Sequence, residues 1–193
     1  MNRYLVAAAV GTLALSACKQ EGTSISNNQT QGMTDEAAVE NSAAAASNRS
    51  TSANPSADQT YVNNAAASDI FEIESSKLAL EKATLPSIKT YAQMMIDEHT
   101  KSSNELMAAV VQGKLTGRIA MPAEQAAKLE ALKGLSGAAF DRQYLADQCA
   151  GHQDTLAKVN AYLASAPAGP LKDHAAKVTG VVQKHLNSLE KIK

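Results

Sequence analysis

Tryptophan is absent from this chain of 193 residues, and aromatic residues make up only 4% of it. Such scarcity, together with abundant alanine, favours helices over sheets. It also leaves few rings that could stack on nucleic acid bases. The formal net charge of −1 lacks the basic excess that is typical of nucleic-acid-binding proteins, so no nucleic acid partner is expected.

Cysteine occurs only twice, which is too few for a disulfide scaffold. No apolar run reaches the roughly 18 residues of a transmembrane helix. A glycine-rich phosphate loop and a strained nucleophile elbow are also missing. The sequence therefore offers no familiar catalytic signature, and its length suits one domain with extensions.

The chain begins with the pattern of a secretory signal. Arg3 supplies positive charge, an apolar stretch follows over residues 5–15, and the segment ends in Leu15, Ser16, Ala17 and Cys18. This ending resembles the bacterial lipobox. The resemblance implies that residues 1–17 are a signal peptide that is removed, and that Cys18 is lipidated, with palmitate among its acyl chains.

Three acyl chains would anchor the protein stably to a membrane, which is the one partner that the sequence indicates. Lys19 follows Cys18 where Asp would indicate retention at the inner membrane, so we expect a cell-envelope lipoprotein of the outer membrane that faces the periplasm. Residues 18–57 are predicted to be a disordered tether. About half of the residues after Cys18 in this segment are Ser, Thr, Asn or Gln, and none is aromatic.

Residues 58–193 show helical periodicity and no competing strand pattern. Long helices are predicted over 58–83, 87–112, 138–165 and 171–191, with a short helix over 123–133 between the second and third of them. Four amphipathic helices of this length predict an all-α fold, a four-helix bundle with one short extra helix.

Each long helix has one ionisable residue in the middle of its apolar face. At about 100° per residue these are Glu72, His99, His152 and His185. At about 1.5 Å rise per residue, each lies roughly 18–21 Å from the start of its helix. We therefore expect all four side chains to converge at mid-bundle. His174 lies on the inner face of the last helix, but near its start.

Three imidazoles and one carboxylate are a ligand set for a single transition-metal ion such as Cu, Zn, Fe or Mn. A buried carboxylate must be paired, protonated or bound to a cation. The alternative is a polar Glu–His network that fixes the helix register without a metal.

Four further residues lie near the predicted ligands along the helices. Met95 and Cys149 are each one turn from a histidine, and these soft ligands would favour copper, although both residue types also serve as plain packing. Gln148 and Glu98 are positioned to support the ligands as hydrogen-bond partners.

The same residues resemble the ferritin-like family called domain of unknown function 4142, whose bacterial members are often labelled as outer membrane proteins. The resemblance covers about residues 59–191 and rests on Glu72-Ile73, Lys77-Leu78-Ala79, Met95 to His99, Phe140-Asp141, His152 and His185-Leu186. It implies a ferritin-like bundle and an exported location, and no established activity. Glu98 stands where the family commonly has Asp.

The Glu-x-x-His pairs of di-iron enzymes are missing, which argues against di-iron chemistry. The sequence thus predicts an envelope lipoprotein whose bundle binds one transition-metal ion for storage, sensing or protection. The alternative is a non-catalytic structural or partner-binding envelope protein in which the buried Glu/His network only stabilises the fold. A redox enzyme would also need an open coordination position and a substrate channel.

Overall fold

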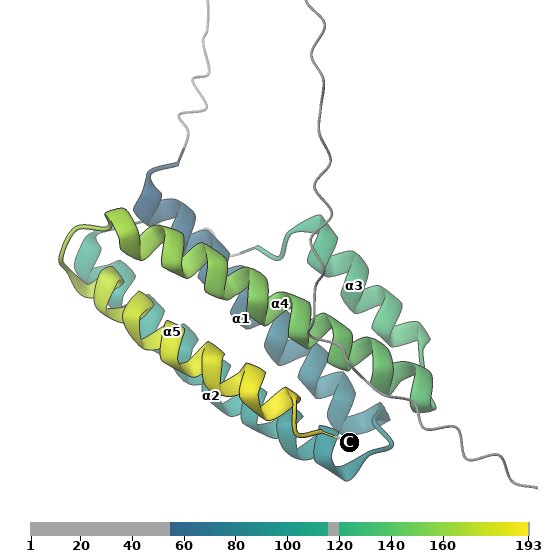
Figure 1. The fold of residues 1–193 in the computed structure, drawn as a ribbon. Helices are drawn as coiled ribbons and strands as arrows, with labels where there is room; N and C mark the ends of the chain where they lie inside the picture. Colours follow the sequence, from purple (N-terminus) through teal and green to yellow (C-terminus); the bar gives the residue numbers. More distant parts are fainter. Residues whose placement is uncertain (1–54, 116–119, 193) are drawn as a thin grey trace, which may run out of the picture. The chain divides into compact units, whose positions relative to one another are not determined.

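The computed structural model describes residues 55–115 and 120–192. Within these ranges the chain forms five helices and no strand, so the predicted all-α fold is confirmed (Figure 1). The helices are α1 (Ala57–Lys82), α2 (Pro86–Gly113), α3 (Ala123–Gly134), α4 (Gly137–Ser165) and α5 (Pro170–Leu189). The predicted helix ends agree with these to within two residues. The predicted signal peptide, Cys18 and nearly all of the tether lie outside the described residues.

Local sequence signals explain where the helices begin and end. The Ser56 hydroxyl accepts a hydrogen bond from the backbone N–H of Gln59 at 3.1 Å and caps the start of α1. Pro86 disfavours helical backbone at the preceding residue, and the chain is extended there between α1 and α2. Gly169, with a φ of 156°, adopts a backbone conformation that side-chain-bearing residues rarely take, and Pro170 then starts α5.

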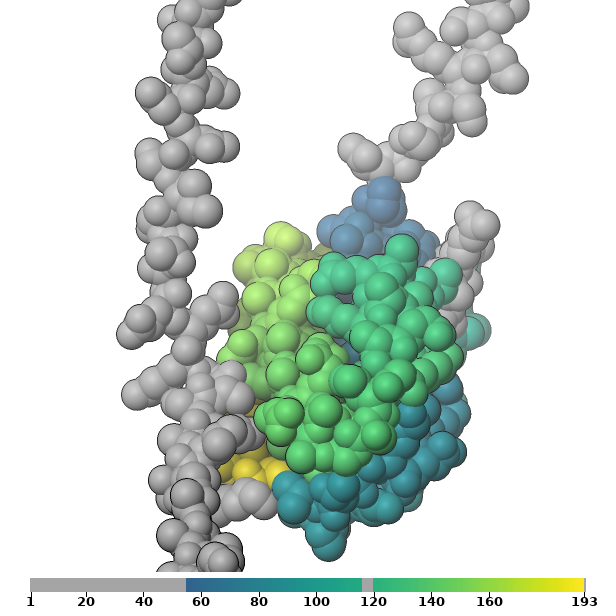
Figure 2. Space-filling model, turned by 90° about the vertical axis from the view of Figure 1, so that its right-hand side faces the viewer, coloured from purple at the N-terminus to yellow at the C-terminus, as the bar shows by residue number. Residues whose placement is uncertain are grey.

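The four long helices pack in a closed ring. Helix α1 lies against α2 and α4, and α5 lies against the same two helices. Neighbours in the ring are antiparallel, because α1 and α5 run in one direction and α2 and α4 in the other (Figure 1). The short helix α3 packs outside the ring against α1 and α4, and Figure 2 shows it beside α4 on one face of the domain.

The core consists of two apolar clusters. One surrounds Tyr61, Leu106 and Val159, where α4 meets α5. The other surrounds Ile88, Phe140 and other residues where α1 meets α2. Buried charged and polar side chains include Asp69, Glu72, Ser75, His99, Gln148 and His152 from the middle of α1, α2 and α4, and His185 from the C-terminal part of α5. A polar layer therefore lies in the interior between two apolar ends.

No helix within residues 55–115 and 120–192 combines the length and apolar character that a membrane span requires.

Helix α3 is held against the bundle by one buried side chain and by the hydrogen bonds of one lysine. Leu132 is its one fully buried side chain and belongs to the apolar cluster at the α1–α2 end. The Lys82 ammonium adds hydrogen bonds to the backbone carbonyls of Lys133 and Leu135, at the end of α3. These two contacts hold α3 across α1 and α4.

We predict that Leu132→Ala lowers the free energy of unfolding by about 2–4 kcal/mol, because it leaves a cavity under α3. Urea denaturation followed by circular dichroism measures the loss. The matched control is Leu129→Ala on the same helix, where the side chain is only half-buried and a smaller loss is expected. Equal losses for both variants would show that Leu132 does not anchor α3.

Candidate metal centre

Three histidines from three helices meet in the polar layer. His99 of α2, His152 of α4 and His185 of α5 each offer a ring nitrogen, and these nitrogens all lie within 4.8 Å of one another. Their residues are 6%, 1% and 0% exposed. The predicted convergence at mid-bundle is therefore confirmed for the three histidines.

Each ring is held from outside by a hydrogen-bond acceptor. His99 Nδ1 lies 2.8 Å from Asp69 Oδ1, and His185 Nε2 lies 2.9 Å from Glu98 Oε2. His152 Nδ1 lies 2.7 Å from the backbone carbonyl of Gln148. A carbonyl or an ionised carboxylate can only accept, so each of these ring nitrogens must donate a proton.

The carboxylate of Glu98 is well suited to this role because it stays ionised. Partial burial raises the pKa of Glu98, but hydrogen bonds from Lys184 and His185 outweigh that effect and hold the pKa below its usual value. Lys184 Nζ lies 2.5 Å from Glu98 Oε1. Glu98 therefore links a surface lysine to the buried imidazole and orients that ring.

The outer hydrogen bonds leave the inner ring nitrogens of the neutral rings with lone pairs. His99 Nε2 is buried and has no hydrogen-bond partner among the described residues. His152 Nε2 and His185 Nδ1 lie 3.0 Å apart. Two lone pairs at that separation repel each other unless a proton or a metal ion lies near both. The three rings thus form a pocket of electron pairs that a cation would stabilise.

The electrostatics keep two of the rings neutral. Burial, reinforced by the neighbouring histidines, lowers the pKa of His152 to about 3 and of His185 to about 4. Burial also lowers the pKa of His99, but the hydrogen bond and negative charge of Asp69 raise it by more, so the net shift is upward. A second proton on His152 or His185 is therefore disfavoured at neutral pH, which leaves a metal ion as the better partner for their lone pairs.

The separations are near those that one ion requires. Two nitrogens at about 2.0–2.1 Å from a tetrahedral ion lie about 3.4 Å apart. The contact between His152 and His185 is slightly shorter than this, and the widest separation in the group, up to 4.8 Å, is longer. A ring shift of about 1 Å would bring the three nitrogens to ligand distances.

Glu72, the fourth predicted ligand, lies at the edge of the group. Its Oε1 is 3.7 Å from His152 Nδ1, the ring nitrogen that faces outward, and the residue is not among those whose ligand atoms cluster. Its Oε2 is buried without a hydrogen-bond partner among the described residues. Burial raises the pKa of Glu72 to about 7. The structure therefore brings together three of the four predicted ligands.

The other predicted neighbours separate into two groups. Glu98 contacts His185, and the backbone of Gln148 contacts His152, as described above. The Gln148 side chain also donates to Ser75 Oγ at 3.2 Å. Met95 and Cys149 are buried in the apolar cluster at the α1–α2 end, and the clustered ligand atoms include no atom of Cys149.

Sequence reasoning missed Asp69, which orients His99. Asp69 is 4% exposed, and Ser103 Oγ donates to its second oxygen at 3.0 Å. The sequence did contain an indication of this role. Asp69 lies three residues before Glu72, so both acids are on one face of α1, and an acid beside a predicted ligand could have been expected to contact the site.

His174 is separate from the centre, as its position near the start of α5 predicted. Its Nδ1 lies 2.6 Å from the Tyr61 hydroxyl and its Nε2 lies 3.2 Å from the carbonyl of Ser102. Both ring nitrogens therefore have partners within the protein, in contrast to the three clustered rings.

A cavity of about 420 Å³ borders the centre on one side. His99, Asp69 and Glu98 line it together with aliphatic residues of α5 such as Val178 and Val182. Of the three clustered histidines, His99 is the one that lines this cavity. It offers a route from the surface to His99, to its partner Asp69, and to Glu98, the partner of His185.

Comparisons with known proteins agree with these observations at the level of the family. Residues 40–192 match the family described as Domain of unknown function (DUF4142). The match begins inside the segment predicted to be a tether. Searches of curated proteins and of solved structures found no match. Because the family match spans most of the chain, the protein belongs to the domain of unknown function 4142 family.

Proposed function

We propose that the helical bundle binds one first-row transition-metal ion through His99, His152 and His185. The observation that supports this most strongly is the pair of facing lone pairs on His152 and His185, whose opposite ring nitrogens donate to fixed acceptors, beside the buried His99 Nε2 that has no partner among the described residues. Histidine ligands of metal ions almost always donate their second N–H to a carboxylate or carbonyl. Each of the three rings follows that pattern.

Charge balance favours an ion of two positive charges. Asp69 and Glu98 each contact a ligand ring, and the buried Glu72 carboxyl lies beside His152. Imidazole nitrogen suits Zn, Cu, Fe and Ni better than the hard ions Mg and Ca. We propose that the bound ion serves storage, sensing or protection in the cell envelope.

We also propose a ferritin-like topology for the bundle. Helices α2 and α4 run in the same direction, so the connection that contains α3 must return along the length of the bundle. One long crossover of this kind distinguishes ferritin-like bundles from simple up-and-down bundles.

We predict that the purified protein takes up one metal ion per chain when Zn, Cu, Fe or Mn is supplied. The double variant His99→Ala, His152→Ala should lose this ion, whereas His174→Ala, which removes a buried histidine outside the centre, should retain it. Elemental analysis after gel filtration measures the ratio. Negligible metal in all three proteins would refute the proposal.

Thermal melting separates this proposal from a purely structural network, because an ion that binds only the folded chain raises its melting temperature. A strong chelator should lower the melting temperature of the metal-loaded protein and leave the double variant unchanged. A melting temperature that is insensitive to the chelator would favour the buried Glu/His network as a device of the fold.

We predict that metal affinity decreases as the pH falls through the raised pKa of His99, because a protonated imidazole cannot bind the ion. The decrease should be about tenfold per pH unit while a single proton competes. Below about pH 4 the other two rings compete as well. Asp69→Asn removes the charge that raises the pKa of His99, so the decrease should begin at lower pH.

A metal-binding titration at several pH values, with a competing chelator, checks this expectation. Asp97→Asn is the matched control, since Asp97 is exposed on α2 and accepts a hydrogen bond from Gln93. If metal affinity begins to fall at the same pH in Asp69→Asn and in the unmodified protein, Asp69 does not set the pKa of His99.

We further propose that Cys18 is lipidated and that the protein is anchored at the outer membrane. In a bacterial host fed labelled palmitate, the unmodified chain and Cys149→Ser should both carry the label in the membrane fraction, and Cys18→Ser should not. Label that persists in Cys18→Ser would contradict the anchor.

A further inference from the structure

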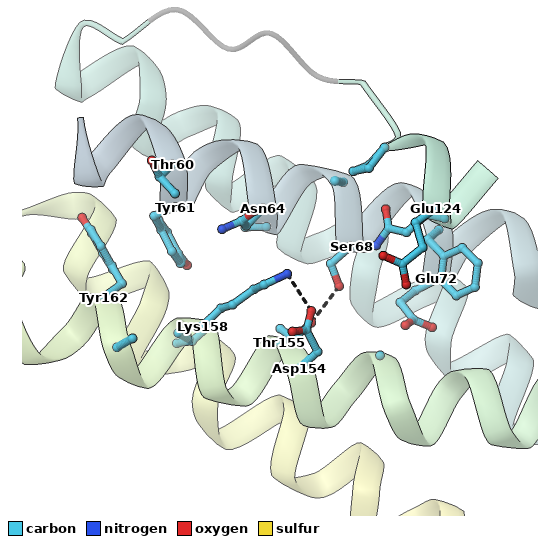
Figure 3. Close-up of a pocket in the computed structure, with 18 of the residues that line it drawn as sticks. Thr60, Tyr61, Asn64, Ser68, Glu72, Glu124, Asp154, Thr155, Lys158 and Tyr162 are labelled. Carbon is cyan, nitrogen blue, oxygen red and sulfur yellow. Dashed lines mark hydrogen bonds and ion pairs between the residues drawn. The ribbon is translucent and has the colours of Figure 1, made fainter. Parts of the chain in front are cut away.

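A second and larger cavity, of about 720 Å³, lies between α1, α3 and α4 (Figure 3). Its volume lies in the range of small-molecule binding sites. The lining extends along α1 from Ala57 to Glu72, which is about 22 Å at the rise of an α-helix. The cavity is therefore elongated, with Tyr61 and Tyr162 toward one end and Glu72 at the other.

Small residues create this space. Gly151 of α4 faces Glu72, and a Cβ at that position would lie only 3.1 Å from Glu72 Oε1. Ala65 and Ala150 also line the cavity. The Ser68 and Thr155 hydroxyls meet at 3.1 Å between α1 and α4 (Figure 3).

Three acceptor oxygens that line the cavity have no donor among the described residues. They are Glu72 Oε2 from α1, Gln125 Oε1 from α3 and Asp147 Oδ2 from α4. Glu72 is 1% exposed and Asp147 is 7% exposed. A buried acceptor oxygen that receives no hydrogen bond lowers the stability of the folded protein. Three such oxygens in one cavity therefore indicate a ligand with several N–H or O–H groups.

The charges around the cavity are negative on balance. The two lysines of the lining already have partners: Lys128 lies 3.1 Å from Glu124, and Lys158 lies 2.7 Å from Asp154. Within the described residues, no lysine or arginine forms an ion pair with either of the two buried carboxylates, Glu72 and Asp147. A cation is therefore the ligand that this end of the cavity favours.

The opposite end contains two aromatic rings, with the polar side chains of Thr60 and Asn64 beside them. The rings of Tyr61 and Tyr162 are stacked, with centroids 4.3 Å apart. Their hydroxyls are already bonded, to His174 and Asp58 respectively. The two tyrosines thus offer ring surface to the cavity, which suits a hydrocarbon chain.

We propose that this cavity binds a small organic cation, an alkylammonium compound whose N–H groups donate to Glu72, Asp147 and Gln125 and whose hydrocarbon part lies toward the tyrosines. An inorganic ion fits less well, because the cavity has the volume of many water molecules. Glu72 also lies 3.7 Å from His152 of the metal centre, whereas no hydrogen bond or ion pair within the described residues joins Asp147 or Gln125 to the clustered histidines, so variants of these two residues test the cavity separately.

Isothermal titration of the full chain with hexylammonium tests the proposal. We expect binding with one site per chain and at least tenfold weaker binding of the neutral analogue 1-hexanol. Asp147→Asn should weaken hexylammonium binding at least tenfold, and Gln125→Leu, which keeps the net charge, about threefold. Asp97→Asn removes an equal charge from the exposed surface of α2 and should have no effect.

The metal content of Asp147→Asn, measured in parallel, should equal that of the unmodified protein, so the two sites can fail separately. Circular dichroism shows whether Asp147→Asn and Gln125→Leu are folded. If one of them is not, the binding measured with the other variant tests the proposal. Equal binding of hexylammonium and hexanol, no binding, or unchanged binding in a folded cavity variant would overturn the proposal. Tight binding of Ca or Mn in competition with hexylammonium would assign the cavity to an inorganic ion instead.

Discussion

The structure depends on the hydrogen bonds that hold three imidazoles from outside. Asp69, the carbonyl of Gln148 and Glu98 accept from one nitrogen of each ring. Because these acceptors cannot donate, they determine which nitrogen carries the proton and direct the lone pairs toward one another. Facing lone pairs on His152 and His185 in a buried layer are unfavourable by themselves, and this is the reason to expect an ion there.

The rest of the fold buries the three rings and holds them in place. Apolar clusters close the bundle on both sides of the polar layer, and the antiparallel ring brings α2, α4 and α5 together at the same level. Small residues on α1 and α4 leave room for the larger cavity, and α3 forms one of its walls. The short helix, which contributes little to the core, thereby gains a role in a binding surface.

Helical periodicity predicted a large part of this arrangement. One histidine on the apolar stripe of each of α2, α4 and α5 was enough to predict that three rings converge, although His185 lies near the end of α5 and not at its midpoint. Glu72 met the same criterion of face and height, yet it lies beside the outward nitrogen of His152. The sequence predicts the height of a residue along its helix to about one turn. Whether its side chain can bind an ion depends on the position of the ligand atom to about 1 Å, which is set by the rotamers of the packed side chains.

The amino-acid sequence alone determined the helices, their buried faces and the identity of the central histidines, since these follow from local periodicity and from proline and glycine at the helix ends. Only the tertiary structure decided which carboxylate orients each ring, which nitrogens face inward and which acceptors remain without donors. These properties depend on contacts between residues far apart in the chain, such as Asp69 with His99 and Glu98 with His185, and no pattern within a single helix specifies them.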